Sequence, residues 1–407
     1  MDGTKKYGFS SFQGSQYEPQ EERLAVMHSS KKLVIGIPRE VSLQENRVAL
    51  IPNSVRALVA EGHRIIIESE AGKQASFTNH EYSEAGAEIS QDRKQVFDAD
   101  VLVKVAPPTL EEIDMMHADQ LLISPLQIPV ISDDYIKKLC SKRVIAVAME
   151  YYKDDDGSFP LVRIMSEMAG ISAVLTAADL VGNIEKGRGV LLGGISGVPP
   201  AKIVILGAGM VAEFATRTAV GLGASVRIFD DNVYKLIRLQ RHIGIPIHTS
   251  TLSPVHLQYQ LLSADVVIGA MHSKTGRTPI VVTEEMVSKM KSGSVIIDVS
   301  IDQGGCFETS RLTTHEYPTF IKYDVIHYCV PNLASKIPRT ASHALSNILT
   351  PILRNAGYAQ NIESLIFESP GLRHGIYTYK GRLTNRYLSG RFEMKYTDLE
   401  LLLTSSF

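Results

Sequence analysis

The chain has 407 residues, of which 44% are hydrophobic, and a formal net charge of −2. Its length is enough for two or three domains of about 150 residues each. The nearly balanced charge, without a polybasic cluster, argues against nucleic acid or a membrane surface as partner, and the three scattered cysteines argue against a disulfide framework or a zinc site. With no long apolar run and no apolar signal segment, we expect a cytoplasmic protein without membrane insertion and without a metal.

The first third of the chain alternates strand and helix patterns. Residues 1–31 are polar and lack periodicity, which predicts a mobile or briefly helical arm. Apolar strand patterns then occur at 33–37, 63–68, 100–105 and 144–149, with helical patterns from Ser54 and from Asp92. This alternation predicts a parallel sheet covered by helices on both faces.

The rest of the chain predicts a second sheet and a returning helix. A helical pattern covers 159–181, a glycine-rich loop covers 187–200, and strand patterns follow at 201–206, 225–230, 265–270, 294–299 and 325–330. The apolar helix from Thr340 to Gly357, with a kink expected at Pro351, should pack back on the first domain. We therefore predict an N-terminal arm (1–31), a substrate domain (32–160 plus 340–407) and a nucleotide-binding domain (161–339), with the active site in the cleft between them.

The turn after the strand at 201–206 has the pattern of a dinucleotide-binding site. Gly207 permits a tight turn, Gly209 lets a pyrophosphate approach the backbone, and Ala212 takes the place of the third glycine where helix and strand pack closely. Asp230 ends the next strand, where it can accept hydrogen bonds from a ribose 2′-hydroxyl and would repel a 2′-phosphate. The sequence therefore favours NAD over NADP.

Three charged residues are candidates for substrate chemistry. Arg47 follows the first strand and presents a planar fork suited to a carboxylate, or it pairs with Glu40 or Glu45 to fix its loop. Lys104 lies in an apolar strand pattern, where it either reaches solvent or is partly desolvated to bind a substrate. Asp302 leaves a buried strand ahead of two glycines, so it either faces the cleft or bonds its own turn.

Several longer motifs resemble the alanine dehydrogenase and pyridine nucleotide transhydrogenase family over roughly residues 33–375. The motifs are Gly-Ile-Pro-Arg-Glu (36–40), Arg-Val-Ala (47–49), Val-Leu-Val-Lys-Val (101–105), Met-Ser-Glu-Met-Ala-Gly (165–170), Gly-Arg-Gly-Val-Leu-Leu-Gly-Gly (187–194), Ile-Asp-Gln-Gly-Gly-Cys-Phe-Glu (301–308) and Tyr-Cys-Val-Pro-Asn (328–332). The resemblance implies an α/β fold with two doubly wound, Rossmann-like domains. It also implies a homo-oligomer, either a hexamer or a dimer.

The resemblance also implies a reaction and a set of site residues. The reaction is the NAD-dependent, reversible oxidative deamination of L-alanine to pyruvate and ammonia. Arg47 and Lys104 would hold the amino acid or 2-oxo acid, and Asp302 would assist at the reacting carbon. Further contacts to NAD, beside the glycine turn, would come from Asp230 and from three other positions, Ser166, Lys235 and Asn332.

One departure from the family pattern bears on the chemistry. Alanine dehydrogenases carry a histidine where this chain has Gln127, and an amide cannot shuttle a proton near neutral pH. The proton transfer would then fall to Lys104 and Asp302, with His272 as a further candidate. Two alternative functions remain: an NAD(H)-binding subunit of a transhydrogenase-like assembly, and an NAD(H)-binding protein without turnover.

Overall fold

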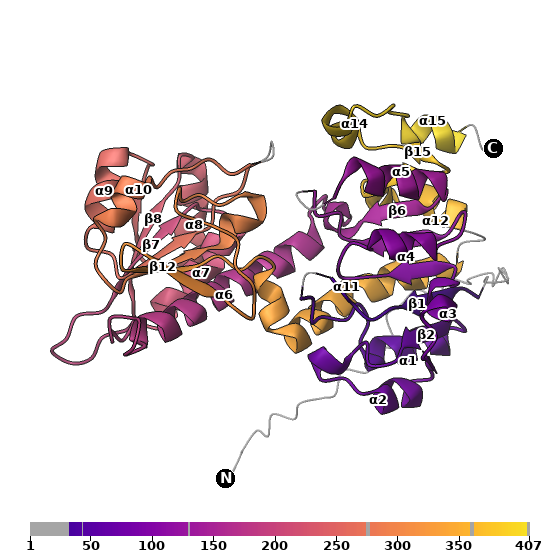
Figure 1. The fold of residues 1–407 in the computed structure, drawn as a ribbon, viewed down its shortest axis with the longest axis horizontal. Helices are drawn as coiled ribbons and strands as arrows, with labels where there is room; N and C mark the ends of the chain where they lie inside the picture. Colours follow the sequence, from indigo (N-terminus) through magenta and orange to yellow (C-terminus); the bar gives the residue numbers. More distant parts are fainter. Residues whose placement is uncertain (1–31, 43, 129–130, 274–276, 359–361, 405–407) are drawn as a thin grey trace, which may run out of the picture.

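The computed structural model describes residues 32–42, 44–128, 131–273, 277–358 and 362–404. The predicted arm at 1–31 lies outside these residues. The described chain forms two α/β lobes, each built on its own sheet (Figure 1). The first sheet has the strand order β15-β14-β6-β5-β4-β1-β2-β3, and the second has the order β12-β13-β11-β10-β7-β8-β9.

The first lobe follows the strand and helix alternation of the sequence. Strands β1 to β6 pair in parallel, while β14 and β15, from the end of the chain, add an antiparallel edge. The strands are β1 (Val34–Ile37), β2 (Arg64–Glu68), β3 (Glu88–Ser90), β4 (Val101–Val103), β5 (Leu121–Ser124), β6 (Ile145–Ala148), β14 (Ile376–Tyr379) and β15 (Arg382–Leu383). The helices are α1 (Pro52–Ala60), α2 (Asn79–Glu84), α3 (Arg93–Phe97), α4 (Leu110–Asp114), α5 (Asp133–Ser141), α12 (Ile362–Glu368), α13 (Pro370–Arg373), α14 (Arg386–Phe392) and α15 (Leu399–Thr404), with 3-10 turns η1 (Lys73–Ala75) and η2 (Met149–Tyr151).

The second lobe is a doubly wound sheet that carries the predicted dinucleotide turn. All its strand pairs are parallel except the pair of β12 and β13. The strands are β7 (Lys202–Leu206), β8 (Ser225–Phe229), β9 (His248–Ser250), β10 (Val266–Gly269), β11 (Val295–Asp298), β12 (Thr319–Lys322) and β13 (Val325–Tyr328). The helices are α7 (Met210–Gly221), α8 (Val233–Ile243), α9 (Pro254–Leu261) and α10 (Glu284–Ser288), with 3-10 turns η3 (Val299–Gln303) and η4 (Leu333–Lys336). The predicted fold class of two doubly wound domains is confirmed.

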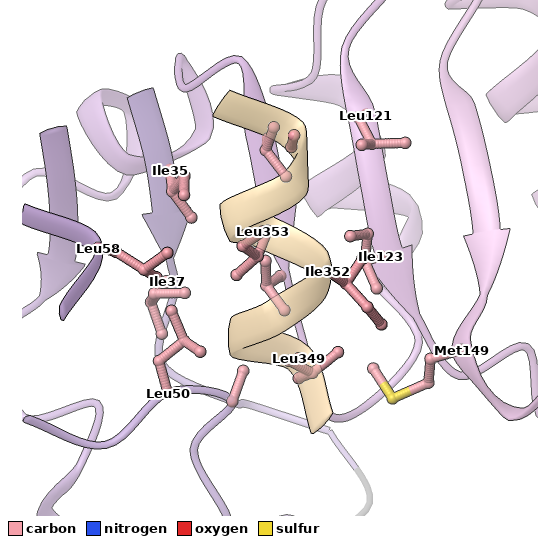
Figure 2. Packing of buried hydrophobic residues seen from close by; sticks show 14 of the residues in the cluster. Ile35, Ile37, Leu50, Leu58, Leu121, Ile123, Met149, Leu349, Ile352 and Leu353 are labelled. Carbon is pink, nitrogen blue, oxygen red and sulfur yellow. The ribbon is translucent and has the colours of Figure 1, made fainter. Parts of the chain in front are cut away.

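Helix α11 (Pro338–Tyr358) returns the chain from the second lobe to the first. Leu349, Ile352 and Leu353 on this helix belong to the same buried cluster as side chains of β1 and β5 (Figure 2). The predicted packing of this helix on the first domain is therefore confirmed, and the helix continues past Pro351. Near the C-terminus, Leu403 of α15 is also buried in this cluster, so the end of the described chain covers its own first lobe.

Helix α6 (Pro160–Gly182) links the two lobes (Figure 1). By length and composition it is the one helix of the described residues that could cross a membrane, yet 44% of its most apolar window is buried inside the protein. It packs closely on α7 at Gly170, where an added Cβ would lie 2.4 Å from the Val211 carbonyl oxygen. The rest of the protein therefore covers part of the apolar surface of α6, whereas Val162, Ile171 and Leu175 on this helix are exposed.

Replacing Gly170 by alanine is expected to destabilise the protein. The new methyl group has to push α6 and α7 apart, and overpacking of this kind costs about 1–3 kcal/mol. The measurement is the midpoint of thermal or urea unfolding, which should fall. Gly182→Ala is a matched control on the same helix because the Cβ there would meet its nearest neighbour at 3.9 Å. Equal midpoints for the two variants would contradict the close packing at Gly170.

Candidate active site between the two lobes

Arg47 lies at the contact between the lobes, on the loop that follows β1. Its guanidinium donates to Glu45 twice, from Nε to Oε1 at 2.7 Å and from Nη2 to Oε2 at 2.6 Å. Nη2 also donates to Oδ1 of Asn332 in the second lobe at 2.8 Å. Burial would raise the pKa of Glu45, but the charge and hydrogen bonds of Arg47 outweigh it and lower that pKa. Glu45 is therefore a carboxylate, and it holds Arg47 in place.

Asn332 joins this pair to Asp302. Its Nδ2 donates to Oε2 of Glu45 at 2.6 Å, and its backbone N–H donates to Oδ1 of Asp302 at 3.2 Å. Asn332 itself has a left-handed backbone, with φ of 54°, a conformation that asparagine adopts more readily than most residues. Arg47, Asn332 and Asp302, which were predicted separately, thus form one hydrogen-bonded group with members from both lobes.

Asp302 is surrounded by protein but still faces open space. The residue keeps a substantial exposed surface. Partial removal of water by the surrounding protein raises its pKa to about 6, although the hydrogen bond from Asn332 and the charge of Arg47 act in the opposite direction. The side chain can therefore accept or release a proton close to neutral pH.

Lys104 is buried and paired with two carboxylates in this structure. Its side chain has no exposed surface, and Nζ donates to Glu40 at 2.7 Å and to Glu112 at 3.2 Å. Burial would lower the pKa of the ammonium, but the two carboxylates raise it. Glu112 in turn pairs with Arg93, so Lys104 belongs to a buried ionic network beneath the ends of the strands.

Gln127 lies just beyond the carboxyl end of β5, at the edge of the first sheet where the loops after β1 and β4 also begin. Its backbone is left-handed, with φ of 46°, and its N–H donates to the Glu150 carboxylate at 3.3 Å. The N–H of Leu126 donates to the same carboxylate at 2.9 Å. The hydrogen bonds of the described residues do not link Gln127 to Arg47 or Asp302.

The dinucleotide turn has the geometry that its sequence predicts. Gly207 has φ of 105°, and a Cβ there would lie 2.4 Å from the Ala270 carbonyl oxygen, whereas nothing lies within 4 Å of a Cβ on Gly209. Ala212 is fully buried against the sheet. Open space at Gly209, ahead of the free N–H groups that begin α7, fits a bound phosphate group.

Asp230 lies beside this turn. It is buried, and its carboxylate accepts from the backbone N–H of Ala208 at 2.7 Å, with Nζ of Lys235 at 3.7 Å. His272 follows β10, and partial removal of water together with the charge of Lys235 lowers its pKa. Ser166 is half-buried on α6.

Comparison with known proteins agrees with this arrangement. Residues 36–169 match the model of the alanine dehydrogenase/PNT N-terminal domain, and residues 173–386 match that of the C-terminal domain. The chain belongs to this family. Curated relatives in the family include alanine dehydrogenase 2 of Staphylococcus aureus strain USA300, which is 39% identical over 370 residues, covering 90% of this chain and 98% of the relative.

Solved structures in the family have the same two-lobed fold. An L-alanine dehydrogenase matches with a TM-score of 0.83 and 37% identity, over 89% of this chain and 99% of that one. A transhydrogenase from Sinorhizobium meliloti matches with a TM-score of 0.73 and 24% identity, over 87% and 99%. At that identity the second likeness concerns the fold alone.

Sequence reasoning missed the acids that organise the site. Glu45 was considered only as one of two partners for Arg47, and Glu112, Glu150 and Asp298 were not considered. Asp298 could have been found, because it ends a strand whose other residues are all apolar. A hollow of about 270 Å³ beside the lobe contact is lined by Asn46, His315, Pro318, Tyr328 and Lys336. A larger, shallow hollow of about 550 Å³ near α3 and α4 contains none of the predicted site residues.

Proposed function

We propose that the chain catalyses the NAD-dependent, reversible oxidative deamination of L-alanine to pyruvate and ammonia in the cytoplasm. The observation that carries the proposal is the group of Arg47, Asn332 and Asp302, in which two lobes jointly present a cation and a titratable acid. Membership of a family whose matched relatives are named alanine dehydrogenases supports the choice of substrate.

Arg47 is the proposed anchor for the substrate carboxylate. Glu45 already takes its Nε and part of Nη2, which fixes the plane of the guanidinium and leaves Nη1, now 3.0 Å from the Met165 sulfur, as the group for the ligand. A planar donor held in one orientation loses little entropy on binding.

Asp302 is the proposed proton acceptor. With a pKa of about 6 it is ionised at neutral pH but remains easily protonated, as required of a group that takes a proton from the amine or from the attacking water and later returns one. When bound, NAD would supply the redox step as the acceptor of the hydride that leaves Cα. Overall, L-alanine, NAD and water would give pyruvate, ammonium, NADH and one proton.

The second lobe provides the proposed NAD site. Gly207, Gly209 and Ala212 leave room for the pyrophosphate at the start of α7, and Asp230 with Lys235 lies where the adenosine ribose would bind. Ser166 and Asn332 are the proposed contacts nearer the nicotinamide. The buried carboxylate of Asp230 disfavours a 2′-phosphate, which supports NAD over NADP.

Lys104 has a different proposed role from the one expected from the sequence. Its ammonium would have to leave two carboxylates to reach a substrate, and breaking a buried pair costs several kcal/mol. We assign it instead to fixing Glu40, which also accepts from the N–H of Val105 at 2.6 Å and so ties the loop after β1 to the loop after β4.

The test is the formation of NADH by the purified full-length chain from NAD and L-alanine, with D-alanine as control. The reverse reaction should consume NADH only when both pyruvate and ammonia are present. Tight NADH binding without turnover of L-alanine or other small L-amino acids would favour a transhydrogenase-like subunit or a binding protein. Light scattering would test the proposed homo-oligomer.

Replacing Gln127 by histidine is expected to increase kcat. An imidazole near this sheet edge adds a group that titrates near neutral pH. A well-positioned general acid or base raises the rate by about 100-fold or more, so a newly introduced one that is less well positioned should raise kcat by at least about tenfold. The pH profile should gain a limb near the ordinary histidine pKa. Gln127→Asn is the control, because asparagine tolerates the left-handed backbone but carries no titrating group. Equal rates in both variants would exclude a role for this position in proton transfer.

A further inference from the structure

Asp298 is a buried carboxylate at the end of β11 for which the proposed mechanism has no use. The residue is 1% exposed. Its Oδ1 accepts from the backbone N–H of Ser300 at 3.0 Å, and its Oδ2 accepts from the N–H of Cys306 at 3.1 Å and from the Ser310 hydroxyl at 2.6 Å. One side chain therefore gathers donors from both ends of the loop that contains Asp302.

The backbone around Asp298 is shaped to enclose it. A Cβ on Gly269 of the neighbouring strand β10 would lie 2.8 Å from Oδ1, and a Cβ on Gly305 would lie 2.6 Å from Oδ2. Gly305 also has φ of 79°, which disfavours other residues there. A side chain at either position would displace the carboxylate, so both glycines serve to admit it.

The enclosed carboxylate determines where Asp302 lies. Asp298 is the N-cap of the 3-10 turn η3, which carries Asp302. The Ser300 hydroxyl accepts from the N–H of Met271 and donates to its carbonyl oxygen, both at 2.9 Å, and so fixes the same turn to the end of β10. The Asp302 carboxylate itself accepts a hydrogen bond from the backbone N–H of Asn332. Asp302 is thus part of a rigid turn whose centre is Asp298.

Within the described part of the chain, few charged groups act on Asp302 and Asp298. Asp302 is influenced by Arg47, which favours its ionised form, and by Asp298, which disfavours it. Burial raises the pKa of Asp298 to about 6, and the hydrogen bonds from the Ser310 hydroxyl and from backbone N–H groups of the loop oppose the rise. The thiols of Cys306 and Cys329 are close enough to feel its charge. Arg277, which packs on Gly304, is the nearby cation on the outer side of the turn.

We propose that Asp298 is a positioning residue for the reaction assigned to Asp302: its enclosed carboxylate binds the donors at both ends of the loop and so fixes the turn that carries Asp302. The catalytic part of this inference depends on the proposed function. The influence of Asp298 on the ionisation of Asp302 does not, because it is a property of the folded chain alone.

The test is a carboxyl ¹³C NMR titration of the full-length protein labelled at aspartate Cγ, with the Asp302 signal assigned from its absence in Asp302→Asn. In Asp298→Asn the midpoint of Asp302 should fall by about half a pH unit or more, because a like charge has been removed. Ser310→Ala keeps the carboxylate and loses one donor, so Asp298 is protonated at higher pH and the Asp302 midpoint should fall by less. Asp324→Asn, on the exposed surface of the same lobe, should leave it unchanged.

The enzyme assay separates this inference from the proposed function. If the wild-type chain turns over L-alanine, the acidic limb of kcat/KM in both Asp298→Asn and Ser310→Ala should move to lower pH by as much as the NMR midpoint. An unchanged Asp302 midpoint in both variants overturns the inference whether or not the chain is active. Absence of turnover with a shifted midpoint overturns the proposed function and leaves the control of Asp302 by Asp298 supported.

Discussion

Replacing Arg47 by methionine is expected to lower kcat/KM for L-alanine by about 100- to 1,000-fold. The variant removes the guanidinium that we propose as the anchor for the substrate carboxylate, and loss of a desolvated charge pair of this kind costs about 3–4 kcal/mol. NADH should still bind, because the dinucleotide turn lies on the other lobe, but with a moderately lower affinity, because Asn332 loses its hydrogen bond from Arg47. Steady-state kinetics and a fluorescence titration with NADH measure the two quantities.

The same substitution leaves Glu45 buried without its cation, so a loss of activity has to be separated from a loss of folding. Glu45 has no exposed side-chain surface, and an unpaired buried charge costs about 3–5 kcal/mol. The double variant Glu45→Gln/Arg47→Met should regain much of the lost stability without regaining activity. Arg47→Lys, which keeps the charge but not the planar fork, should be intermediate. Near wild-type kcat/KM in the double variant would show that Arg47 is not the anchor.

The sequence predicted most of the central strands because each is a short apolar run buried on both faces, although β5, which has the same character, was not predicted. β10 and β11, for example, consist almost entirely of valine and isoleucine with buried side chains. Strands at the edges of the sheets were not predicted, because an edge strand can be polar or can come from a distant part of the chain. β9 is short and largely polar, and β14 joins β6 in antiparallel register from the far end of the chain, which no local pattern reveals.

The site was predicted less completely than the fold. Arg47 and Asp302 were identified from their places after buried strands. Asn332 was named only through the family resemblance, as a contact to NAD, and its hydrogen bonds to Arg47 and Asp302 were not expected. The environment of Lys104 could not be inferred from alternation along its strand. β4 ends at Val103, so Lys104 lies beyond the regular pleat, and its partners Glu40 and Glu112 are brought to it by other segments.

The outcome for Lys104 concentrates the proton chemistry on Asp302. A lysine held by two carboxylates has its proton stabilised and has no exposed surface from which to exchange it. The amide of Gln127 does not titrate in the neutral range. We therefore propose Asp302 for the proton transfer, because it combines a pKa of about 6 with an exposed surface.

Replacing Asp302 by asparagine is consequently expected to lower kcat for the oxidative deamination by about 100- to 10,000-fold, the usual contribution of a positioned general base. In the wild-type protein the rate should rise as pH passes upward through about 6, because the ionised form of Asp302 accepts the proton. Asparagine is neutral at every pH, so the variant should lack this limb while still binding NADH. The pH dependence of kcat and an NADH titration provide the measurements.

The substitution Asp302→Asn should raise the stability of the folded protein at alkaline pH while it lowers the activity. The pKa of Asp302 in the folded chain lies above its ordinary value of 3.8, so ionisation in the folded state costs stability, and this cost appears as pH rises from about 4 to above 6. At pH 8 the asparagine variant should therefore unfold at a somewhat higher temperature than the wild-type protein, by an amount limited by the solvent that reaches this side chain. Removal of a desolvated charge at a catalytic position should stabilise the fold. An asparagine variant that is inactive and also less stable at pH 8 would therefore indicate that Asp302 mainly stabilises its own turn.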